Sequence, residues 1–248
     1  KIITIITLGL MIMACGKQES IKKIGITQIV EHPALDGARD GFLKALEDAG
    51  YKDGENLKIE YQNAQGDQAV AQSIAESFVS DSKDLILAIA TPTAQAAYNA
   101  TKEIPVLITA VTDPIQAGLA KSLEKSETNV TGTSDATPID KQFALIRELL
   151  PESKKVGIVY NTSELNSEVQ VAQAKVIAQK YGLELVIKGV TSVNDLAQVL
   201  DSLLKEVDVL YTPTDNLIVS ATPLVVKKAM ENKIALIGCI EDQVNQGA

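Results

Sequence analysis

Short apolar runs alternate with amphipathic stretches along the chain, and this alternation limits the fold more than any other feature. The runs expected to be β-strands are residues 23–29, 57–61, 85–90, 105–110, 155–160, 184–190, 207–211 and 234–240. Between them, apolar residues recur at helical spacing, as at Ala38, Phe42, Ala45, Leu46 and Ala49. Repeated strand–helix–strand units predict an α/β protein with mostly parallel sheets, helices on both faces and right-handed crossovers. Only 4% of the residues are aromatic, so aliphatic side chains must build the core, which suits buried parallel strands.

The pattern occurs twice. Residues 23–130 read β-α-β-α-β-α-β, and residues 136–248 read as a helix over 138–150 followed by the same order of elements. A short polar segment that contains glycine, residues 129–135, lies between the halves and fits a hinge strand. We therefore expect two α/β lobes, residues 22–131 and 132–248, with a cleft between them.

The first residues have the pattern of an export signal. Residues 2–14 are an apolar run behind Lys1, and this run is shorter than the roughly 20 residues that span a membrane. It ends in Ala14-Cys15-Gly16, which looks like a lipobox, where a cysteine takes a lipid anchor. We expect a lipoprotein signal peptide over residues 1–14, lipidation of Cys15, a tether over 15–21, and at least one residue before Lys1. The alternative is an ordinary cleaved signal followed by an unrelated cysteine.

Composition excludes several classes of function. The chain has 23 basic and 32 acidic residues, a net charge of −9, which disfavours binding to nucleic acid. With lipid on Cys15, Cys239 would be alone and no disulfide could form. A single histidine, His32, excludes a multi-histidine metal site. No dinucleotide loop, phosphate loop or nucleophile elbow is present, so no cofactor or metal is expected.

The loops after the strands are where a ligand should lie, because open α/β sheets bind ligands at the carboxyl ends of their strands. These loops are residues 30–35, 91–96, 111–114, 161–164, 212–216 and 241–242, and each carries polar or acidic groups. In the second loop, Thr91 suits a helix N-cap and Pro92 the first helical turn. Such a turn exposes free N–H groups that could hold a carboxylate, although a simple helix cap explains this motif equally well.

Four of these segments carry a family resemblance. The segments are ITQIVEHPALDGARDGF at residues 26–42, ATPTAQ at 90–95, TAVTDP at 109–114 and YTPTDN at 211–216. Together they closely resemble ABC-transporter substrate-binding lipoproteins of the tryptophan/tyrosine-binding type. The resemblance covers the chain from about residue 22 to its last residue.

The resemblance implies a type I periplasmic-binding-protein fold, in which two Rossmann-like lobes close on a ligand. It implies a monomer, lipid-anchored on the outer face of a bacterial membrane, that delivers an aromatic amino acid to an ABC permease and is not an enzyme. It also implies that the chain, which stops at residues 244–248, lacks a final segment that returns to the first lobe.

The expected ligand-binding residues are Gln28, His32, Pro33, Thr91, Pro92, Thr93, Thr112, Asp113, Asn161, Asp215, Asn216 and Glu241. By the resemblance, Asp215 and Asn216 match an Asp-Asn pair that faces the cleft, and residues 91–93 match a turn that holds the ligand carboxylate. We expect Asp215, or else Asp113, to accept the ligand ammonium group. His32, Pro33 and Pro92 offer a flat wall, and Gln28 and Asn161 add orienting hydrogen bonds.

Two other hypotheses stay open. The same fold could bind a branched-chain amino acid, a nucleoside or a sugar. An exported hydrolase or isomerase that uses His32 with Asp113 is a remote third hypothesis, and it predicts turnover that is lost in His32→Ala.

Overall fold

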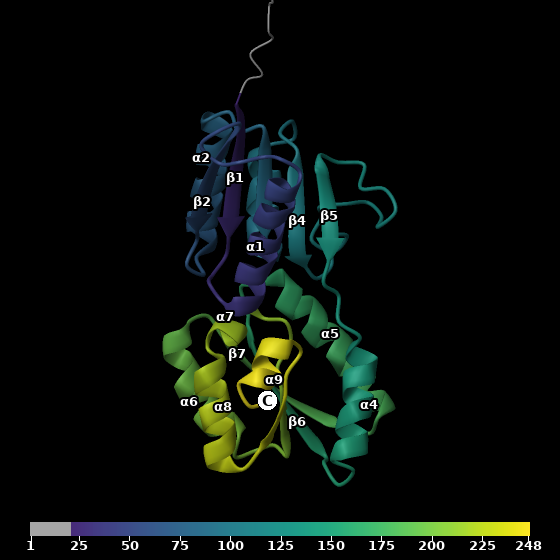
Figure 1. The fold of residues 1–248 in the computed structure, drawn as a ribbon. Coiled ribbons are helices and arrows are strands. Elements are labelled where there is room, and N and C mark those ends of the chain that lie inside the picture. The colour runs from purple at the N-terminus through teal and green to yellow at the C-terminus, as the bar shows by residue number, and fades with distance from the viewer. Residues whose placement is uncertain (1–20) are drawn as a thin grey trace, which may run out of the picture.

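Two parallel β-sheets, each covered by helices, build the molecule (Figure 1). The structure, a computed structural model, describes residues 21–248. The expected signal peptide, Cys15 and all but the last residue of the expected tether lie outside the described residues. No helix among residues 21–248 has the length and apolar character needed to cross a membrane.

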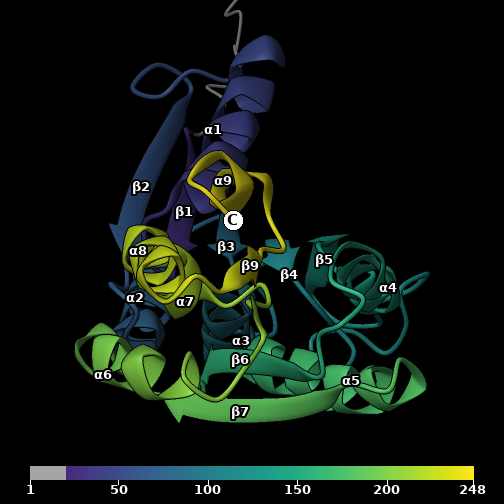
Figure 2. The same cartoon turned by 90° about the horizontal axis from the view of Figure 1, so that it is seen from below.

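The first sheet has the strand order β2-β1-β3-β4-β5, with every pair parallel. Its strands are β1 (Lys22–Gln28), β2 (Leu57–Asn63), β3 (Leu85–Ile89), β4 (Val106–Val111) and β5 (Val130–Ser134). Helix α1 (Pro33–Asp48) covers one face, and α2 (Gln68–Ser80) and α3 (Thr91–Ala100) cover the other (Figure 2). Gly25 in β1 allows α2 to approach closely, because a Cβ there would lie 2.5 Å from the Phe78 ring.

The second sheet has the order β7-β6-β8-β9 and is also parallel. Its strands are β6 (Lys155–Asn161), β7 (Glu184–Val190), β8 (Val209–Tyr211) and β9 (Ala235–Ile237). Its helices are α4 (Ile139–Leu149), α5 (Leu165–Lys180), α6 (Val193–Leu203), α7 (Asn216–Ser220), α8 (Thr222–Asn232) and α9 (Glu241–Asn245). Phe143 and Tyr211 pack edge to face in its core, with ring centroids 5.3 Å apart.

The predicted α/β fold with parallel sheets is confirmed, and each predicted strand is present. Residues 130–134 of the expected hinge segment form β5, which pairs with β4 and belongs to the first sheet. The expected lobe boundary at residues 131 and 132 therefore falls inside a strand that runs on to Ser134, and the division itself stays a prediction. The loops that follow β1, β4 and β5 of the first sheet and β8 of the second line one cavity, so the carboxyl ends of the two sheets face each other.

Candidate ligand-binding site

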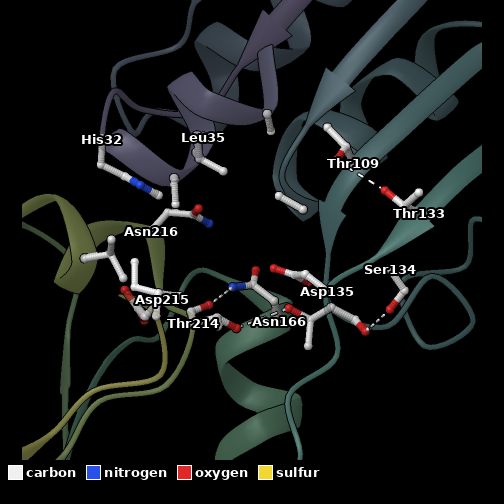
Figure 3. A pocket seen from close by; sticks show the side chains of 16 residues that line it. His32, Leu35, Thr109, Thr133, Ser134, Asp135, Asn166, Thr214, Asp215 and Asn216 are labelled. Carbon is white, nitrogen blue, oxygen red and sulfur yellow. Dashed lines mark hydrogen bonds between the residues drawn. The ribbon is translucent and has the colours of Figure 1, made fainter. Parts of the chain in front are cut away.

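A cavity of about 300 Å³ lies between the two sheets, and we refer to it as the cleft cavity (Figure 3). The first lobe lines it with His32, Ala34, Leu35, Ala38, Thr109, Ala110, Thr112, Thr133, Ser134 and Asp135. The second lobe lines it with Asn166, Thr214, Asp215, Asn216, Val219 and Ile240. Its volume is at the lower end of the range of about 300–1,000 Å³ that is typical of small-molecule sites.

A β-bulge shapes the first-lobe wall. Between paired positions Ile108 and Val111, β4 has one residue more than β5, and Ala110 takes a left-handed conformation with φ of 54°. Thr109 and Ala110 thereby both line the cavity. Thr133 donates a hydrogen bond to the Thr109 hydroxyl (3.3 Å), so the Thr109 proton is free to donate elsewhere.

Asp135 directly follows β5 and brings a carboxyl group to the cavity. Its backbone N–H donates to the carbonyl of Val111 (3.2 Å), which fixes its position beside β4. Burial raises the pKa of this carboxyl, although the neighbouring Thr112 hydroxyl works in the opposite direction. Its Oδ1 is buried and has no hydrogen-bond partner among the described residues. A cationic group in the cavity would satisfy this carboxylate.

The second-lobe wall is organised by Glu164, which is buried. Its carboxylate accepts hydrogen bonds from the side-chain amides of Asn161 (3.0 Å), Asn166 (3.1 Å) and Asn216 (2.5 Å). The Asn166 amide also donates to the carbonyl of Thr214 (3.0 Å), while its Oδ1 is buried and has no partner within residues 21–248. Asn166 therefore presents an unused acceptor from the second lobe. Figure 3 draws Asn166 and Asp135 close together on the cavity wall.

Asp215 is fully buried and its carboxylate is used inside the lobe. It accepts hydrogen bonds from the N–H of Asn161 (2.6 Å), the Ser167 hydroxyl (2.7 Å) and the N–H of Ile218 (2.9 Å). Burial and then the charge of Glu164 raise its pKa, whereas these donors lower it. Asp215 thus joins the end of β6 to α5 and caps α7, which is a structural role.

His32 reaches the cavity from the N-cap position of α1. The residue is 8% exposed, and its Nδ1 is buried without a hydrogen-bond partner in the described part of the chain. Burial lowers its pKa, against the raising effects of Asn216, Asp36 and Asp242. The pair of His32 with Asp113 that catalysis would require is not formed, because Asp113 accepts hydrogen bonds from Ile115 and Gln116 in its own turn.

A second cavity, of about 450 Å³, lies between the lobes near β2 and β7 and shares Asn216 with the first. Its walls include residues 65–69 of the first lobe and residues 191–193 of the second. The side-chain amide of Gln68 donates to the carbonyl of Ser163, also in its wall, and so links the lobes. Every buried polar side-chain atom of the residues that line this second cavity already has a hydrogen-bond partner. The cleft cavity, although smaller, is therefore the better candidate site.

Residues 23–248 match the family described as ABC transporter substrate binding protein. The chain belongs to this family. It is 58% identical over 227 residues to the tyrosine-binding protein of Clostridioides difficile strain R20291, which covers 92% of this chain and 66% of that relative. The chain thus spans slightly less than two thirds of this relative's length. The resemblance inferred from the four sequence segments is confirmed at the level of the family.

Two solved substrate-binding proteins bear on the arrangement of the lobes. An ABC domain from Streptococcus pneumonia in complex with L-Trp is 39% identical, with a TM-score of 0.88. A ligand-free, open substrate-binding protein with adhesive properties from Clostridium difficile is 56% identical, with a TM-score of 0.63. Each match covers 92% of this chain and 77% of the solved chain. Although its sequence is less similar, the L-Trp complex superimposes better than the ligand-free, open protein, so the two sheets are arranged here more as they are in the L-Trp complex.

Four of the residues expected at the site line the cleft cavity of this substrate-binding protein. They are His32, Thr112, Asp215 and Asn216. Asn161 lines the second cavity instead, where its side chain bonds to Glu164 and Ser163.

The other expected residues lie outside the cleft cavity. Gln28 is buried and holds its own loop by donating to Val30 and Asp36. Pro33 is the first, exposed residue of α1, and Glu241 is the exposed first residue of α9.

The expected N-cap at Thr91 is wrong. Ala90 is the N-cap of α3, with φ of 82°, and Thr91 and Pro92 are the first helical residues. The Thr93 hydroxyl donates to the carbonyls of Ile89 (2.6 Å) and Ala90 (3.0 Å). Because Thr91, Pro92 and Thr93 are buried against the first-lobe core, none of them lines the cleft cavity.

Sequence reasoning missed two acceptors, Asp135 and Asn166. Asp135 lay in the segment interpreted as a hinge, whereas assigning residues 130–134 to the sheet would have placed it at a strand end. Asn166 lies in the first turn of α5, just beyond the loop considered. Among residues 21–248, no group of three His, Cys, Asp or Glu side chains could hold a metal ion.

Proposed function

We propose that this substrate-binding protein holds one free aromatic amino acid in the cleft cavity and presents it to an ABC permease. The observation that carries the proposal is Asp135, half-buried in the cavity wall, whose Oδ1 is itself buried and has no hydrogen-bond partner among residues 21–248. None of the ion pairs of the described residues involves Asp135. A buried carboxylate without a cation is costly, and the ammonium group of an amino acid removes that cost.

The surrounding groups fit a zwitterion. Asp135 from the first lobe and the Asn166 Oδ1 from the second supply two acceptors for the ammonium group. The Thr109 hydroxyl, which accepts from Thr133 and keeps its own proton, supplies a donor for the ligand carboxylate. Because the acceptors come from both lobes, the ligand ammonium would stabilise the closed arrangement more than the open one.

The apolar part of the wall fits a flat side chain. Leu35, Val219 and Ile240 come from both lobes, and the small residues Ala34, Ala38 and Ala110 leave room between them. A nucleoside or a sugar has no ammonium group for Asp135, so the amino acid is the better-supported ligand. The relative named for tyrosine and the neighbour solved with L-Trp support an aromatic side chain.

Calorimetric titration with L-tyrosine, L-tryptophan, L-leucine and adenosine tests the proposal. We expect the two aromatic amino acids to bind, and Asp135→Asn to weaken their binding at least about tenfold, since it leaves a desolvated ammonium without a countercharge. Asp113→Asn is the matched control, because Asp113 lies outside the cavity, and it should bind like the wild type. Equal losses in both variants, or tight binding of adenosine alone, would overturn the proposal.

We also propose that the protein is a monomer anchored outside the cytoplasmic membrane by lipid on Cys15, and that it has no catalytic activity. The lipobox-like residues 12–16 and the membership of the family support the anchor. Cys15→Ser should release the protein from membranes into the soluble fraction. Retention of this variant in washed membranes would contradict the anchor.

A further inference from the structure

Glu164 lies behind the wall of the cleft cavity. It is buried and lines the second cavity, whereas Asn166 and Asn216, which donate hydrogen bonds to its carboxylate, line the cleft cavity. None of the ion pairs formed within residues 21–248 includes Glu164. A ligand in the cleft cavity would thus meet the two asparagines, and Glu164 would act on it only through them.

Two groups that only accept hydrogen bonds fix the direction of the Asn166 side-chain amide. One end of this amide lies 3.1 Å from Glu164 Oε2 and 3.0 Å from the carbonyl oxygen of Thr214 (Figure 3). Neither a carboxylate nor a carbonyl can donate, so this end must be the Nδ2 group. The other end is Oδ1, which is buried and finds no hydrogen-bond partner in the described part of the chain. Asn166 therefore offers the cavity an acceptor and not a donor.

Glu164 imposes this direction on every amide that it contacts. Its Oε1 accepts from Asn161 Nδ2 (3.0 Å), and its Oε2 accepts from Asn166 Nδ2, from Asn216 Nδ2 (2.5 Å) and from the Asn216 backbone N–H (3.3 Å). Four donors thus surround two oxygens, and each amide must turn its nitrogen toward Glu164 and its oxygen away. A side chain that could also donate would allow one of these amides to turn over.

We propose that Glu164 is a positioning residue for ligand binding: it holds the Asn166 amide with Oδ1 toward the cleft cavity, where the ligand ammonium group donates to it. The inference rests on the proposed function and adds a residue that the ligand does not touch. Without Glu164, the amide can turn its Nδ2 group toward the ammonium group, which places donor against donor and repels the ligand. The second lobe then loses its hold on the group that Asp135 binds from the first lobe.

A double-mutant cycle of Glu164→Ala and Asn166→Ala tests the inference, with L-tyrosine binding measured by calorimetry. We expect each single variant to bind at least about fivefold more weakly than the wild type. The double variant should bind no more than about twofold more weakly than Asn166→Ala alone, because Glu164 acts through Asn166. A merely structural role would weaken binding equally with and without Asn166. Glu168→Ala is the matched control: Glu168 is exposed on α5, bonds to the Tyr160 hydroxyl and should leave binding unchanged.

The outcomes separate this inference from the proposed function. Wild-type affinity in Glu164→Ala, or equal losses in the two backgrounds, would overturn the role of Glu164. A wild type that binds no amino acid, or an Asp135→Asn variant that binds like the wild type, would instead refute the proposed function. If thermal unfolding shows that Glu164→Ala does not fold, Glu164→Gln takes its place in the same cycle. This variant exchanges one acceptor for a donor, and its loss of affinity should likewise require Asn166.

Discussion

The hydroxyl oxygens of Thr112 and Thr214 lie 3.4 Å apart, although Thr112 follows β4 of the first sheet and Thr214 follows β8 of the second. This contact exists only when the lobes are together, so it stabilises the closed arrangement. We expect Thr112→Val to weaken L-tyrosine binding about two- to tenfold, for the loss of about 0.5–1.5 kcal/mol. Calorimetry measures the change, and Thr131→Val, an exposed position on β5, is the control. An equal loss in the control would contradict a role in closure.

Asp215→Ala should destabilise the fold rather than the ligand complex alone. The substitution leaves the buried donors of Asn161, Ser167 and Ile218 without their acceptor. We expect the free energy of unfolding to fall by about 3 kcal/mol or more, as measured by urea denaturation. A variant with wild-type stability and reduced affinity would restore Asp215 as the partner of the ligand ammonium group.

Asp135→Asn should stabilise the fold of the ligand-free protein, in contrast to Asp215→Ala. Burial raises the pKa of Asp135 above its ordinary value of 3.8, so the ionised carboxylate is disfavoured in the folded state. The resulting destabilisation is absent below pH 3.8 and grows as the pH rises through the folded-state pKa. At pH 7 the ligand-free variant should therefore melt at a higher temperature than the wild type, and the difference should shrink toward pH 4. A lower melting temperature at pH 7 would contradict this assignment.

Gly132 permits the pairing of β5 with β4. It has φ of 148°, and a Cβ there would lie 2.0 Å from the carbonyl oxygen of Ile108. We expect Gly132→Ala to lower the free energy of unfolding by about 2–4 kcal/mol and to weaken ligand binding, since Asp135 follows the same strand. Gly41→Ala in α1 is the control: nothing lies within 4 Å of its Cβ position, and it should stabilise by about 0.5–1 kcal/mol. Thermal unfolding of both variants measures the contrast.

The single histidine should make stability depend on pH. The folded-state pKa of His32 is lowered from 6.5, chiefly by burial and against the raising effects of Asn216, Asp36 and Asp242. Below pH 6.5 the unfolded chain gains a proton that the folded protein does not, so stability is lost as the pH falls toward the folded-state pKa. The melting temperature of His32→Leu should fall less between pH 7 and pH 5 than that of the wild type. Parallel pH profiles of the two proteins would contradict this expectation.

The fold could be predicted from the sequence because strands and helices are indicated by the spacing of apolar residues along the chain. Aliphatic runs such as residues 85–90 can bury both faces only in a parallel sheet under helices. The carboxyl ends of parallel strands lie at one edge of the sheet. The prediction that His32, Thr112, Asp215 and Asn216 lie at the cleft followed from this rule, and all four line the cavity.

The roles of individual side chains were not accessible in the same way. Asp113 and Asp215 look alike as residues after strands, but one caps its own turn and the other is enclosed by three donors. The bulge that brings Thr109 and Ala110 to the cavity depends on pairing between β4 and β5, which no local pattern encodes. Asp135 became recognisable only when its strand was seen to belong to the first sheet.

Glu164 gives the two lobes unequal parts in recognition. It orders the amides of Asn161, Asn166 and Asn216 through hydrogen bonds that lie entirely within the second lobe and need no ligand. Rotamers that are already fixed lose little entropy when a ligand arrives. The second-lobe side chains are therefore already ordered before the ligand binds. Most of the conformational entropy lost on binding comes from the first lobe and from the relative motion of the two lobes.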